Sequence, residues 1–195
     1  RADIMSDEDE KAIGLGYSGC PGFCQVGPIV RILPADYFYV QVRPEDAKDI
    51  VEETVLNGKP VERLLFNKQD GQICKTRNEI PFYKDQVNVV LAECGVIEPG
   101  DIRDYIARNG YRALAEALFG MTPEAVVDEV TRSGLRGRGG GGFPTGRKWA
   151  ATQAAQSPKK YIVCNADEGD PGAFMDESIM EGNPHAMLEG MIIAG

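Results

Sequence analysis

The chain has 195 residues, of which 43% are hydrophobic and 26% are charged, so it is long enough for one large or two small domains and is not disordered or fibrous. Its 21 basic and 30 acidic residues give a net charge of -9, which argues against a surface built throughout to hold nucleic acid or anionic lipid. No apolar run approaches the roughly 18 residues of a membrane span, so direct membrane insertion is not expected.

The cysteines and the N-terminus indicate the compartment. The five cysteines are an odd number at uneven spacing, and residues 1–11 are charged and lack the apolar centre of a secretory signal. A cytoplasmic location is therefore expected. Because the chain starts with Arg1 and an apolar segment runs to Gly195, we expect it to be a fragment of a longer protein.

The first predicted elements are a β-hairpin covered by a helix. Residues 28–33 and 37–42 are rich in β-branched and aromatic side chains and are separated by the turn triplet Pro34-Ala35-Asp36. Pro44 suits a first helical position, and apolar residues follow at helical spacing until Asn57-Gly58. The polar residues 67–78 lose this periodicity and predict a linker.

A series of short helices is predicted next, over residues 84–93, 101–108 and 111–119, followed by one that Thr122 caps and Gly134 ends. Beyond a glycine loop at residues 137–142, the pattern predicts a helix capped by Thr145, a short buried strand at 161–164 and an apolar helix from Pro184. His185, the single histidine, excludes a catalytic pair or triad built on histidine within this chain and is expected to have a local role.

The loop Gly137-Arg138-Gly139-Gly140-Gly141-Gly142 lies in the most basic part of the chain. Between Glu129 and Asp167 there is no acidic residue. The basic residues in this interval are Arg132, Arg136, Arg138, Arg147, Lys148, Lys159 and Lys160. Backbone N–H groups of consecutive glycines, the start of the next helix and the charges of Arg138 and Lys148 would suit a phosphate ester. A flexible surface loop with solvated charges is the alternative.

Two nucleotide-binding motifs fail in this context. The loop fits G-x-G-x-x-G formally, but a helical segment rather than a strand precedes it, so a dinucleotide-binding Rossmann turn is excluded. A phosphate loop of the Walker type needs Gly-Lys followed by Ser or Thr, whereas Gly146-Arg147-Lys148-Trp149 follows here.

A second polar segment, Asn165-Ala166-Asp167-Glu168-Gly169-Asp170-Pro171-Gly172, comes directly after the predicted strand. Its carboxylates and amide would accept hydrogen bonds from sugar hydroxyls or ring N–H groups, and open α/β sheets place ligands at this end of a strand. The glycine loop would be the phosphate pole of a site and the acidic segment its polyol pole, and a ligand that needs both is a nucleotide. An acidic turn, or a divalent cation held by Asp167, Glu168 and Asp170, are the alternatives.

Two motifs together resemble a known family. They are Ser133-Gly134-Leu135-Arg136-Gly137-Arg138-Gly139-Gly140-Gly141-Gly142-Phe143-Pro144-Thr145-Gly146-Arg147-Lys148-Trp149 and Cys164-Asn165-Ala166-Asp167-Glu168. Residues 81–195 resemble the NADH-oxidising flavoprotein subunit of respiratory complex I and its relatives in NAD(P)-linked hydrogenases and formate dehydrogenases. Gly169-Asp170 and the residues after it are more similar to the hydrogenase branch. Gly141 stands where the family often has alanine, and Glu177 where it has arginine.

The resemblance implies an electron-transfer oxidoreductase subunit, an NAD(P)H dehydrogenase or diaphorase, that exchanges hydride between NAD(P)H and FMN and passes single electrons to iron–sulfur clusters. Its implied partners are the nicotinamide nucleotide and other subunits of a hydrogenase or NADH dehydrogenase. The implied FMN contacts are Gly137, Arg138, Gly139, Gly140, Lys148, Asn165, Asp167, Glu168 and Gly169. Gly141, Phe143 and Asp170 are implied on the side of NAD(H) or NADP(H). The cofactors carry the chemistry, so no catalytic acid, base or nucleophile is expected.

The segment Gly19-Cys20-Pro21-Gly22-Phe23-Cys24 resembles the second half of a thioredoxin-like [2Fe-2S] ferredoxin domain, which hydrogenase-type subunits carry ahead of the flavin domain. Cys20 and Cys24 are thereby implied as two of the four thiolate ligands of the [2Fe-2S] cluster, with the other pair before Arg1. The resemblance also implies a separate [4Fe-4S] cluster in the full-length subunit. The C-x3-C spacing alone leaves a disulfide or two free thiols open. Cys74, Cys94 and Cys164 match no ligand position and are expected to be buried free thiols.

The expected fold class is α/β, or α+β overall. It comprises a partial thioredoxin-like [2Fe-2S] domain at residues 1–66, a linker at 67–80, a helical lead-in at 81–122 and the first part of an FMN/NADH-binding domain at 123–195. A fragment with only a structural or interaction role is one alternative. An RNA-binding module of RGG type at residues 136–140 is another, but the element is not repeated and few aromatic residues are near it, so no nucleic-acid partner is expected.

Overall fold

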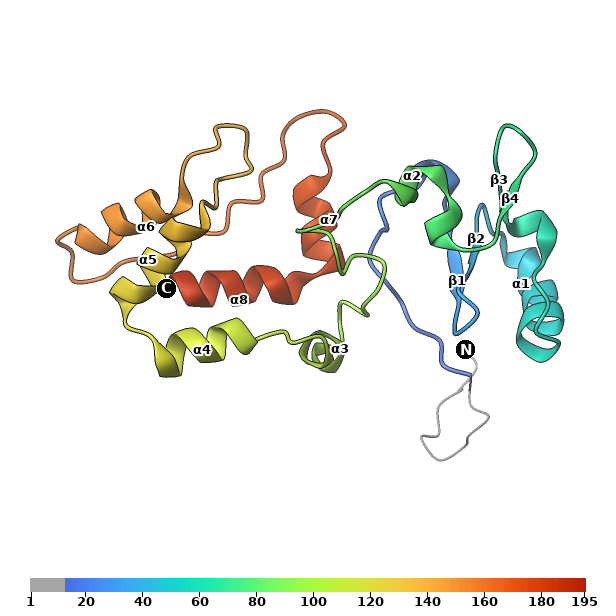
Figure 1. The fold of residues 1–195 in the computed structure, drawn as a ribbon, viewed down its shortest axis with the longest axis horizontal. Coiled ribbons are helices and arrows are strands. Elements are labelled where there is room, and N and C mark those ends of the chain that lie inside the picture. The colour runs from blue at the N-terminus through green and yellow to red at the C-terminus, as the bar shows by residue number, and fades with distance from the viewer. Residues whose placement is uncertain (1–12) are drawn as a thin grey trace. The chain divides into compact units, whose positions relative to one another are not determined.

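The structure is a computed structural model that describes residues 13–195 (Figure 1). Residues 1–12, which the predicted first domain includes, lie outside the described residues. The described chain divides into two compact units, an N-terminal unit of Cys20–Ala92 and a C-terminal unit of Glu93–Gly195 together with residues 13–19. Helices dominate and the sheets are small, as the α+β expectation requires. The domain boundaries expected from the sequence differ from this division and stay a prediction.

The N-terminal unit is built on the predicted hairpin. Strands β1 (Val30–Ile32) and β2 (Tyr37–Tyr39) pair antiparallel, with Val30 opposite Tyr39. Successive side chains of a strand point to opposite faces, so Phe38 and Tyr39 enter different core clusters. Both faces of the hairpin are therefore covered, rather than the single face expected.

The predicted helix covers the Tyr39 face. It begins with a 3-10 turn at Pro44–Asp46, continues as α1 (Ala47–Asp49) and ends in a π-helical stretch, Ile50–Leu56. Gly58 follows with a φ of 69°, which confirms the predicted stop. The core cluster on this face consists of Tyr39, Ile50, Val61, Leu64 and Leu65.

The Phe38 face is covered by residues from the polar stretch expected to be a linker and from just beyond it. Within that stretch β3 (Phe66–Asn67) and β4 (Ile73–Cys74) form a second antiparallel hairpin. The short helix α2 (Pro81–Lys84) follows. The buried cluster on this face consists of Phe38, Cys74, Ile80 and Tyr83.

The helix predicted over residues 84–93 is wrong, because α2 ends at Lys84 and turns follow it. The β-branched residues Val87, Val89 and Val90 lose side-chain freedom in a helix and lower its propensity. Val87 and Val89 are also 90% and 75% exposed, so no packing offsets that loss.

The C-terminal unit is helical, and apart from α7, which the sequence did not predict, its short helices follow the predicted pattern closely (Figure 1). They are α3 (Ile102–Ala107), α4 (Arg112–Gly120), α5 (Pro123–Ser133), α6 (Thr145–Ala154), α7 (Met175–Gly182) and α8 (Pro184–Ala194). Helix α4 lies beside α8, α5 packs on α6, and α7 leads directly into α8. Among residues 13–195, no helix combines the length and the apolar composition needed to cross a bilayer.

A buried carboxylate, that of Glu189, fixes α8 against the start of α4. Its Oε2 accepts hydrogen bonds from the Tyr105 hydroxyl at 2.6 Å and the Tyr111 backbone N–H at 2.9 Å, and its Oε1 accepts one from the Leu114 N–H at 3.0 Å. The Tyr111 hydroxyl lies 2.8 Å from His185 Nδ1, so the single histidine has a local contact near the start of α8, as expected. Satisfying a buried charge this fully makes the contact between the two helices specific.

Candidate functional site

The glycine loop connects two packed helices. Before it, the Thr122 hydroxyl caps α5 by accepting the Ala125 N–H at 3.3 Å, and Gly134 ends the helix with a φ of 69°, both as predicted. After it, α6 begins at Thr145 itself, whose N–H donates to the Leu135 carbonyl at 2.9 Å. The predicted role of Thr145 as a side-chain cap is wrong, because the preceding proline occupies the cap position and no side-chain cap bond forms.

Helices α5 and α6 approach each other at Gly146, which is buried. A Cβ at this position would lie 2.2 Å from Thr131 Oγ1 and 2.6 Å from Thr131 Cα. Glycine is therefore required for the helices to hold the loop in place. Gly146 was not singled out from the sequence, although a glycine in the first turn of a helix is a signal of close approach.

Backbone hydrogen bonds close the base of the loop. The Gly137 N–H donates to the Phe143 carbonyl at 2.9 Å, and the Arg136 guanidinium donates to the Gly142 carbonyl at 3.0 Å. Above this base, the backbone N–H groups of residues 138–143 donate to no acceptor within residues 13–195. A row of exposed N–H groups in a turn is a typical binding surface for an anion.

The four glycines at the tip of the loop fall into two pairs, of which the backbone conformation explains one. Gly140 and Gly142 have φ values of 102° and 58°, so their backbone conformation favours glycine. Gly139 and Gly141 have no such φ, and a Cβ added to either would meet no atom within 4 Å. Neither the conformation nor the packing of the described chain explains these two glycines.

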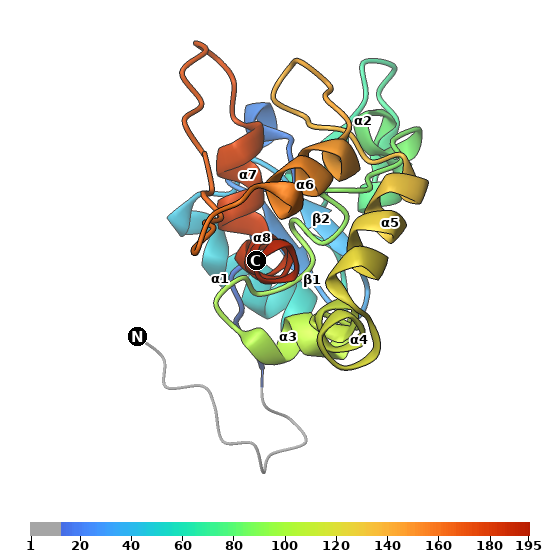
Figure 2. The same ribbon diagram turned by 90° about the vertical axis from the view of Figure 1, so that its left-hand side faces the viewer.

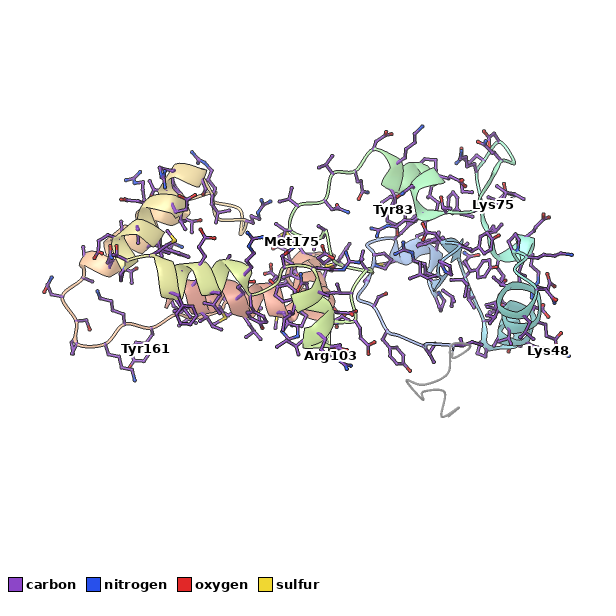
Figure 3. All side chains as sticks on the ribbon, turned by 60° about the horizontal axis from the view of Figure 1, so that its bottom comes forward. Lys48, Lys75, Tyr83, Arg103, Tyr161 and Met175 are labelled. Atoms are coloured by element: carbon purple, nitrogen blue, oxygen red, sulfur yellow. The ribbon has the colours of Figure 1, made fainter. Side chains whose placement is uncertain are left out.

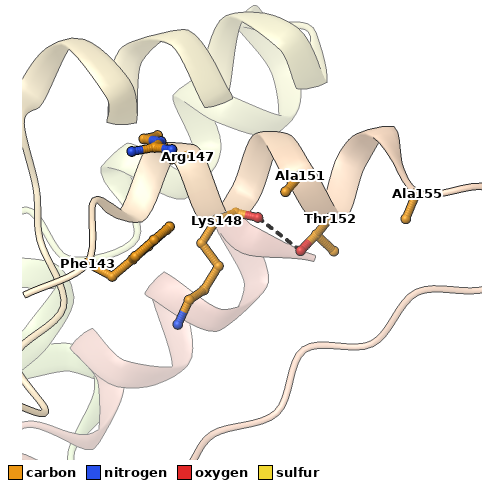
Figure 4. A pocket seen from close by; sticks show the side chains of 6 residues that line it. All are labelled: Phe143, Arg147, Lys148, Ala151, Thr152 and Ala155. Carbon is orange, nitrogen blue, oxygen red and sulfur yellow. Dashed lines mark hydrogen bonds between the residues drawn. The ribbon is translucent and has the colours of Figure 1, made fainter. Parts of the chain in front are cut away.

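Three cations beside the loop have no acidic partner. Arg138, Arg147 and Lys148 form no ion pair within the part of the chain that the structure describes, whereas Arg132 at the end of α5 pairs with Glu129. Figure 4 shows the pocket next to the loop, where the Arg147 guanidinium lies 5.6 Å from the centre of the Phe143 ring. The pocket is lined by Phe143, Arg147, Lys148, Ala151, Thr152 and Ala155.

The strand predicted at residues 161–164 is wrong. The segment is extended coil in which Tyr161 and Val163 are 71% and 82% exposed, and Figure 3 shows Tyr161 projecting away from the helices. No strand of residues 13–195 pairs with it, and a lone strand leaves its N–H and C=O groups unpaired. Cys164 is exposed rather than buried, with its sulfur 3.5 Å from that of Met187 on α8.

Glu168, implied as a flavin contact, caps α7 in the structure. Its carboxylate accepts backbone N–H hydrogen bonds from Met175 at 2.6 Å, Asp176 at 3.0 Å and Glu177 at 3.2 Å. Burial raises the pKa of the Glu168 carboxyl, but these hydrogen bonds outweigh it and hold the pKa below its ordinary value. The charged carboxylate also interacts favourably with the start of the helix.

The other polar residues of the acidic segment are exposed. The Asn165 side chain accepts the Asp167 N–H at 2.9 Å, and Asp170 accepts the Ala173 N–H through its carbonyl at 3.0 Å. The acidic segment and the glycine loop extend to the same side of the C-terminal unit in Figures 1 and 2. No hydrogen bond or ion pair joins the two within the described residues.

The cysteine pair lies in the N-terminal unit, where the sulfurs of Cys20 and Cys24 are 3.6 Å apart without a disulfide bond. A tetrahedral metal with thiolate bonds of about 2.3 Å needs its sulfurs about 3.8 Å apart, so the pair fits two ligands of one metal ion. Among residues 13–195, no further histidine, cysteine or acid joins them in a group of three. Cys74 and Cys94, expected to be buried thiols, are 1% and 3% exposed, which confirms the expectation for these two.

Residues 130–195, which include the glycine loop and the acidic segment, match the family model of the Nuo51 FMN-binding domain. The chain is 54% identical over 112 residues to the NADP-reducing hydrogenase subunit HndC of Solidesulfovibrio fructosivorans, an alignment that covers 57% of this chain and 22% of that protein. It is 47% identical over 106 residues to a subunit of the NADH-quinone oxidoreductase of Rhizobium meliloti (strain 1021), covering 54% of this chain and 25% of that protein.

A solved structure is also similar to the chain. It is a chain of an NAD+-reducing [NiFe]-hydrogenase in the H2-reduced state, with a TM-score of 0.42 and 25% identity over 92% of this chain and 27% of that one. The chain thus spans about a quarter of the length of the proteins it matches. The resemblance to flavoprotein subunits of complex I and of hydrogenases is confirmed by the family model and the sequence relatives.

Proposed function

We propose that the glycine loop holds the phosphate of FMN, and that the chain is part of a subunit that oxidises NAD(P)H or reduces NAD(P)+. The observation that carries the proposal is the pair of glycines, Gly139 and Gly141, that neither conformation nor packing of the chain explains. Because no side chain of the described residues fills the space beside these two glycines, a ligand can contact the backbone there and accept hydrogen bonds from the unpaired N–H groups. The match of residues 130–195 to an FMN-binding domain supports FMN as that ligand.

The phosphate pole combines partial and full positive charges. Arg138, Gly139 and Gly140 present backbone N–H groups that are unpaired within the described chain, while Gly137 fixes the base of the loop through its own N–H. The start of α6 adds the partial charge of a helix N-terminus. Arg138 and Lys148 supply full charges that no acid of residues 13–195 neutralises. Each hydrogen bond to a charged phosphate oxygen contributes about 1.5–3 kcal/mol.

The polyol pole is the acidic segment. Asn165, Asp167 and Gly169 offer acceptors and a backbone N–H for the ribityl chain and the isoalloxazine ring. Glu168 holds this segment on the first turn of α7, which keeps its neighbours in a fixed conformation. Gly141, the exposed ring of Phe143 and the exposed carboxylate of Asp170 are assigned to the nicotinamide side.

The bound flavin would supply hydride exchange with NAD(H) or NADP(H) and electron release in single steps. The chain's own residues bind and orient the reactants, and none is assigned as an acid, base or nucleophile. Cys20 and Cys24 supply two thiolates for a [2Fe-2S] cluster, which their 3.6 Å sulfur separation fits. The proposed partners of this protein are other subunits of a hydrogenase or NADH dehydrogenase, as the names of the relatives suggest, and a cytoplasmic location stays the expectation from the sequence.

Lysine variants of the full-length protein test the phosphate pole. Lys148→Ala should weaken FMN binding about tenfold to about a hundredfold, since one charge-assisted hydrogen bond is lost. The matched control is Lys159→Ala, which removes a lysine of the same basic segment whose ammonium lies 5.1 Å from the Tyr161 ring. Titration of the flavin-free protein with FMN, followed by flavin fluorescence, measures both. Equal losses in the two variants would show that only general electrostatics acts, and no loss in Lys148→Ala would refute the phosphate contact.

The open space above the glycines can be tested separately. Gly139→Val adds a side chain where the described chain has no neighbour, so the unfolding free energy should change little while FMN affinity falls at least tenfold. The control is the thermal unfolding temperature of the variant without FMN, which should match that of the unmodified protein because valine meets no neighbour among the described residues at this position. Unchanged FMN affinity in this variant would remove the observation on which the proposal depends.

A further inference from the structure

One buried hydroxyl of the N-terminal unit has no hydrogen-bond partner. Tyr83 is 6% exposed, and its hydroxyl oxygen is buried without a donor or acceptor in the described part of the chain. Buried hydroxyls are nearly always hydrogen-bonded, because burial without a partner forfeits their hydration. An exception at a specific place indicates that a group outside the described chain completes the hydrogen bond.

The surroundings of Tyr83 point to where that group lies. Burial raises the pKa of Tyr83 to about 12. The positive charge of Arg77 opposes this shift, and the charges of Cys20 and Cys24 add to it. Phe23, which stands between Cys20 and Cys24 in the chain, has its ring centre 5.9 Å from that of Tyr83, so the cysteine segment packs against Tyr83. A tyrosine hydroxyl without a partner among the described residues has one hydrogen-bond donor to offer.

Aromatic packing holds the Tyr83 ring in place. Its edge meets the ring of Phe23, which lies between the two cysteines in the chain, at 5.9 Å, and the ring of Phe38 on β2 at 5.7 Å. The Arg77 guanidinium lies 4.5 Å from the Tyr83 ring centre. Phe82, the preceding residue, stacks on Phe23 at 4.3 Å. The segment that carries the cysteines and the helix that carries Tyr83 are thus packed as one piece, and the hydroxyl cannot turn to solvent without breaking this packing.

We propose that the Tyr83 hydroxyl donates a hydrogen bond to a sulfur of the iron–sulfur cluster that Cys20 and Cys24 hold, an inference that rests on the proposed function. Tyr83 is then a positioning residue that tunes the reduction potential of the cluster. The reduced cluster carries one more negative charge than the oxidised cluster, so a donor to its sulfur stabilises the reduced form more. Arg77, which packs on the ring, adds positive charge in the same direction.

Tyr83→Phe in the full-length protein, purified without oxygen, is the direct test. It removes the hydroxyl and keeps the ring. At a fixed potential the ratio of reduced to oxidised cluster should fall about tenfold, which is a shift of the reduction midpoint of ~59 mV to more negative potential for one electron. Redox titration followed by electron paramagnetic resonance measures the shift. The cluster to follow is the one whose signal is lost in Cys20→Ser.

Tyr39→Phe is the matched control on the other face of the hairpin. The Tyr39 hydroxyl already has partners, with Thr54 Oγ1 at 2.6 Å and the Val61 N–H at 3.0 Å. We expect this variant to lower the unfolding temperature and to leave the midpoint unchanged. Tyr83→Phe, in contrast, should not lower the unfolding temperature of the cluster-free protein, because no protein partner is lost.

The outcomes distinguish the hydrogen bond from the cluster site. An unchanged midpoint in Tyr83→Phe, with a cluster that depends on Cys20, overturns the hydrogen bond and leaves the proposed cluster site standing. A lower unfolding temperature of the cluster-free Tyr83→Phe protein with an unchanged midpoint shows a structural role instead. Unchanged iron content and cluster spectrum in Cys20→Ser overturn the proposed cluster site and this inference with it.

Discussion

Replacement of Glu189 is the sharpest test of how the C-terminal unit is held together. In Glu189→Ala the Tyr105 hydroxyl and the backbone N–H groups of Tyr111 and Leu114 lose their common acceptor. Tyr105 is 8% exposed, so water cannot replace the carboxylate at its hydroxyl, whereas the two N–H groups at the start of α4 are only partly buried. The substitution therefore removes the one acceptor that all three donors share.

The magnitude follows from these three bonds. A hydrogen bond to a charged group contributes about 1.5–3 kcal/mol, and orphaning a buried donor costs about 1–3 kcal/mol. Partial rehydration of the two backbone groups offsets some of this loss, so Glu189→Ala should lower the unfolding free energy by about 3–5 kcal/mol. Glu189→Gln keeps one carbonyl acceptor and turns an NH2 group toward the remaining donor, so about half of that loss is expected.

The pH dependence has a definite sign. Burial raises the pKa of the Glu189 carboxyl, but the hydrogen bonds from Tyr105, Tyr111 and Leu114 outweigh it, so the folded pKa lies below the ordinary value of 4.5. A carboxyl with a depressed folded pKa contributes stability that is fully present above the unfolded value and is lost as pH falls through the folded value. The stability difference between the unmodified chain and Glu189→Gln should therefore be constant near neutral pH and shrink below pH 4.5.

Fluorescence of Trp149, the single tryptophan, reports the C-terminal unit because the residue lies on α6. Urea titrations at several pH values would give the unfolding free energy of each variant. Glu116→Gln, an exposed substitution on α4, is the matched control and should change little. A loss below about 1 kcal/mol in Glu189→Ala, or a difference from Glu189→Gln that grows toward low pH, would refute the reasoning.

Two further predictions concern packing and exposure. Gly146→Ala should destabilise the C-terminal unit by about 1–3 kcal/mol despite the better helix propensity of alanine, because its Cβ would overlap Thr131. Gly120→Ala, with no neighbour within 4 Å, should not destabilise it; equal effects of the two in thermal unfolding would contradict the close approach. Under iodoacetamide, the exposed Cys164 should react faster than the buried Cys74, whose pKa burial raises; mass spectrometry showing equal rates would contradict this difference.

Several elements were predictable because their determinants are local. The turn after residue 33 and the start of the helix at Pro44 follow from residues within one turn of each boundary. The cap at Thr122 and the end of α5 at Gly134 do so as well. The glycine loop and the acidic segment were predicted as a nucleotide-binding pair from their composition and order, and both lie within residues 130–195, which match the family model of an FMN-binding domain.

Other elements depend on partners distant in the chain, and there the local pattern was misleading. Residues 161–164 have strand composition, yet a strand forms only with a neighbour to accept its hydrogen bonds. Gly146 and Glu189 carry out roles that only the packing of helices α5 on α6 and α4 beside α8 reveals.

The sequence by itself indicated the class of the protein and predicted which residues face a nucleotide, since a contiguous loop and its neighbouring charges carry that chemistry. Only the tertiary structure could separate the glycines that the fold requires from the two that it does not, because that distinction depends on the atoms around each backbone position. Only the tertiary structure could bring the Tyr83 ring to Phe23 of the cysteine segment, because the two are separated by about sixty residues in the sequence and meet through aromatic packing.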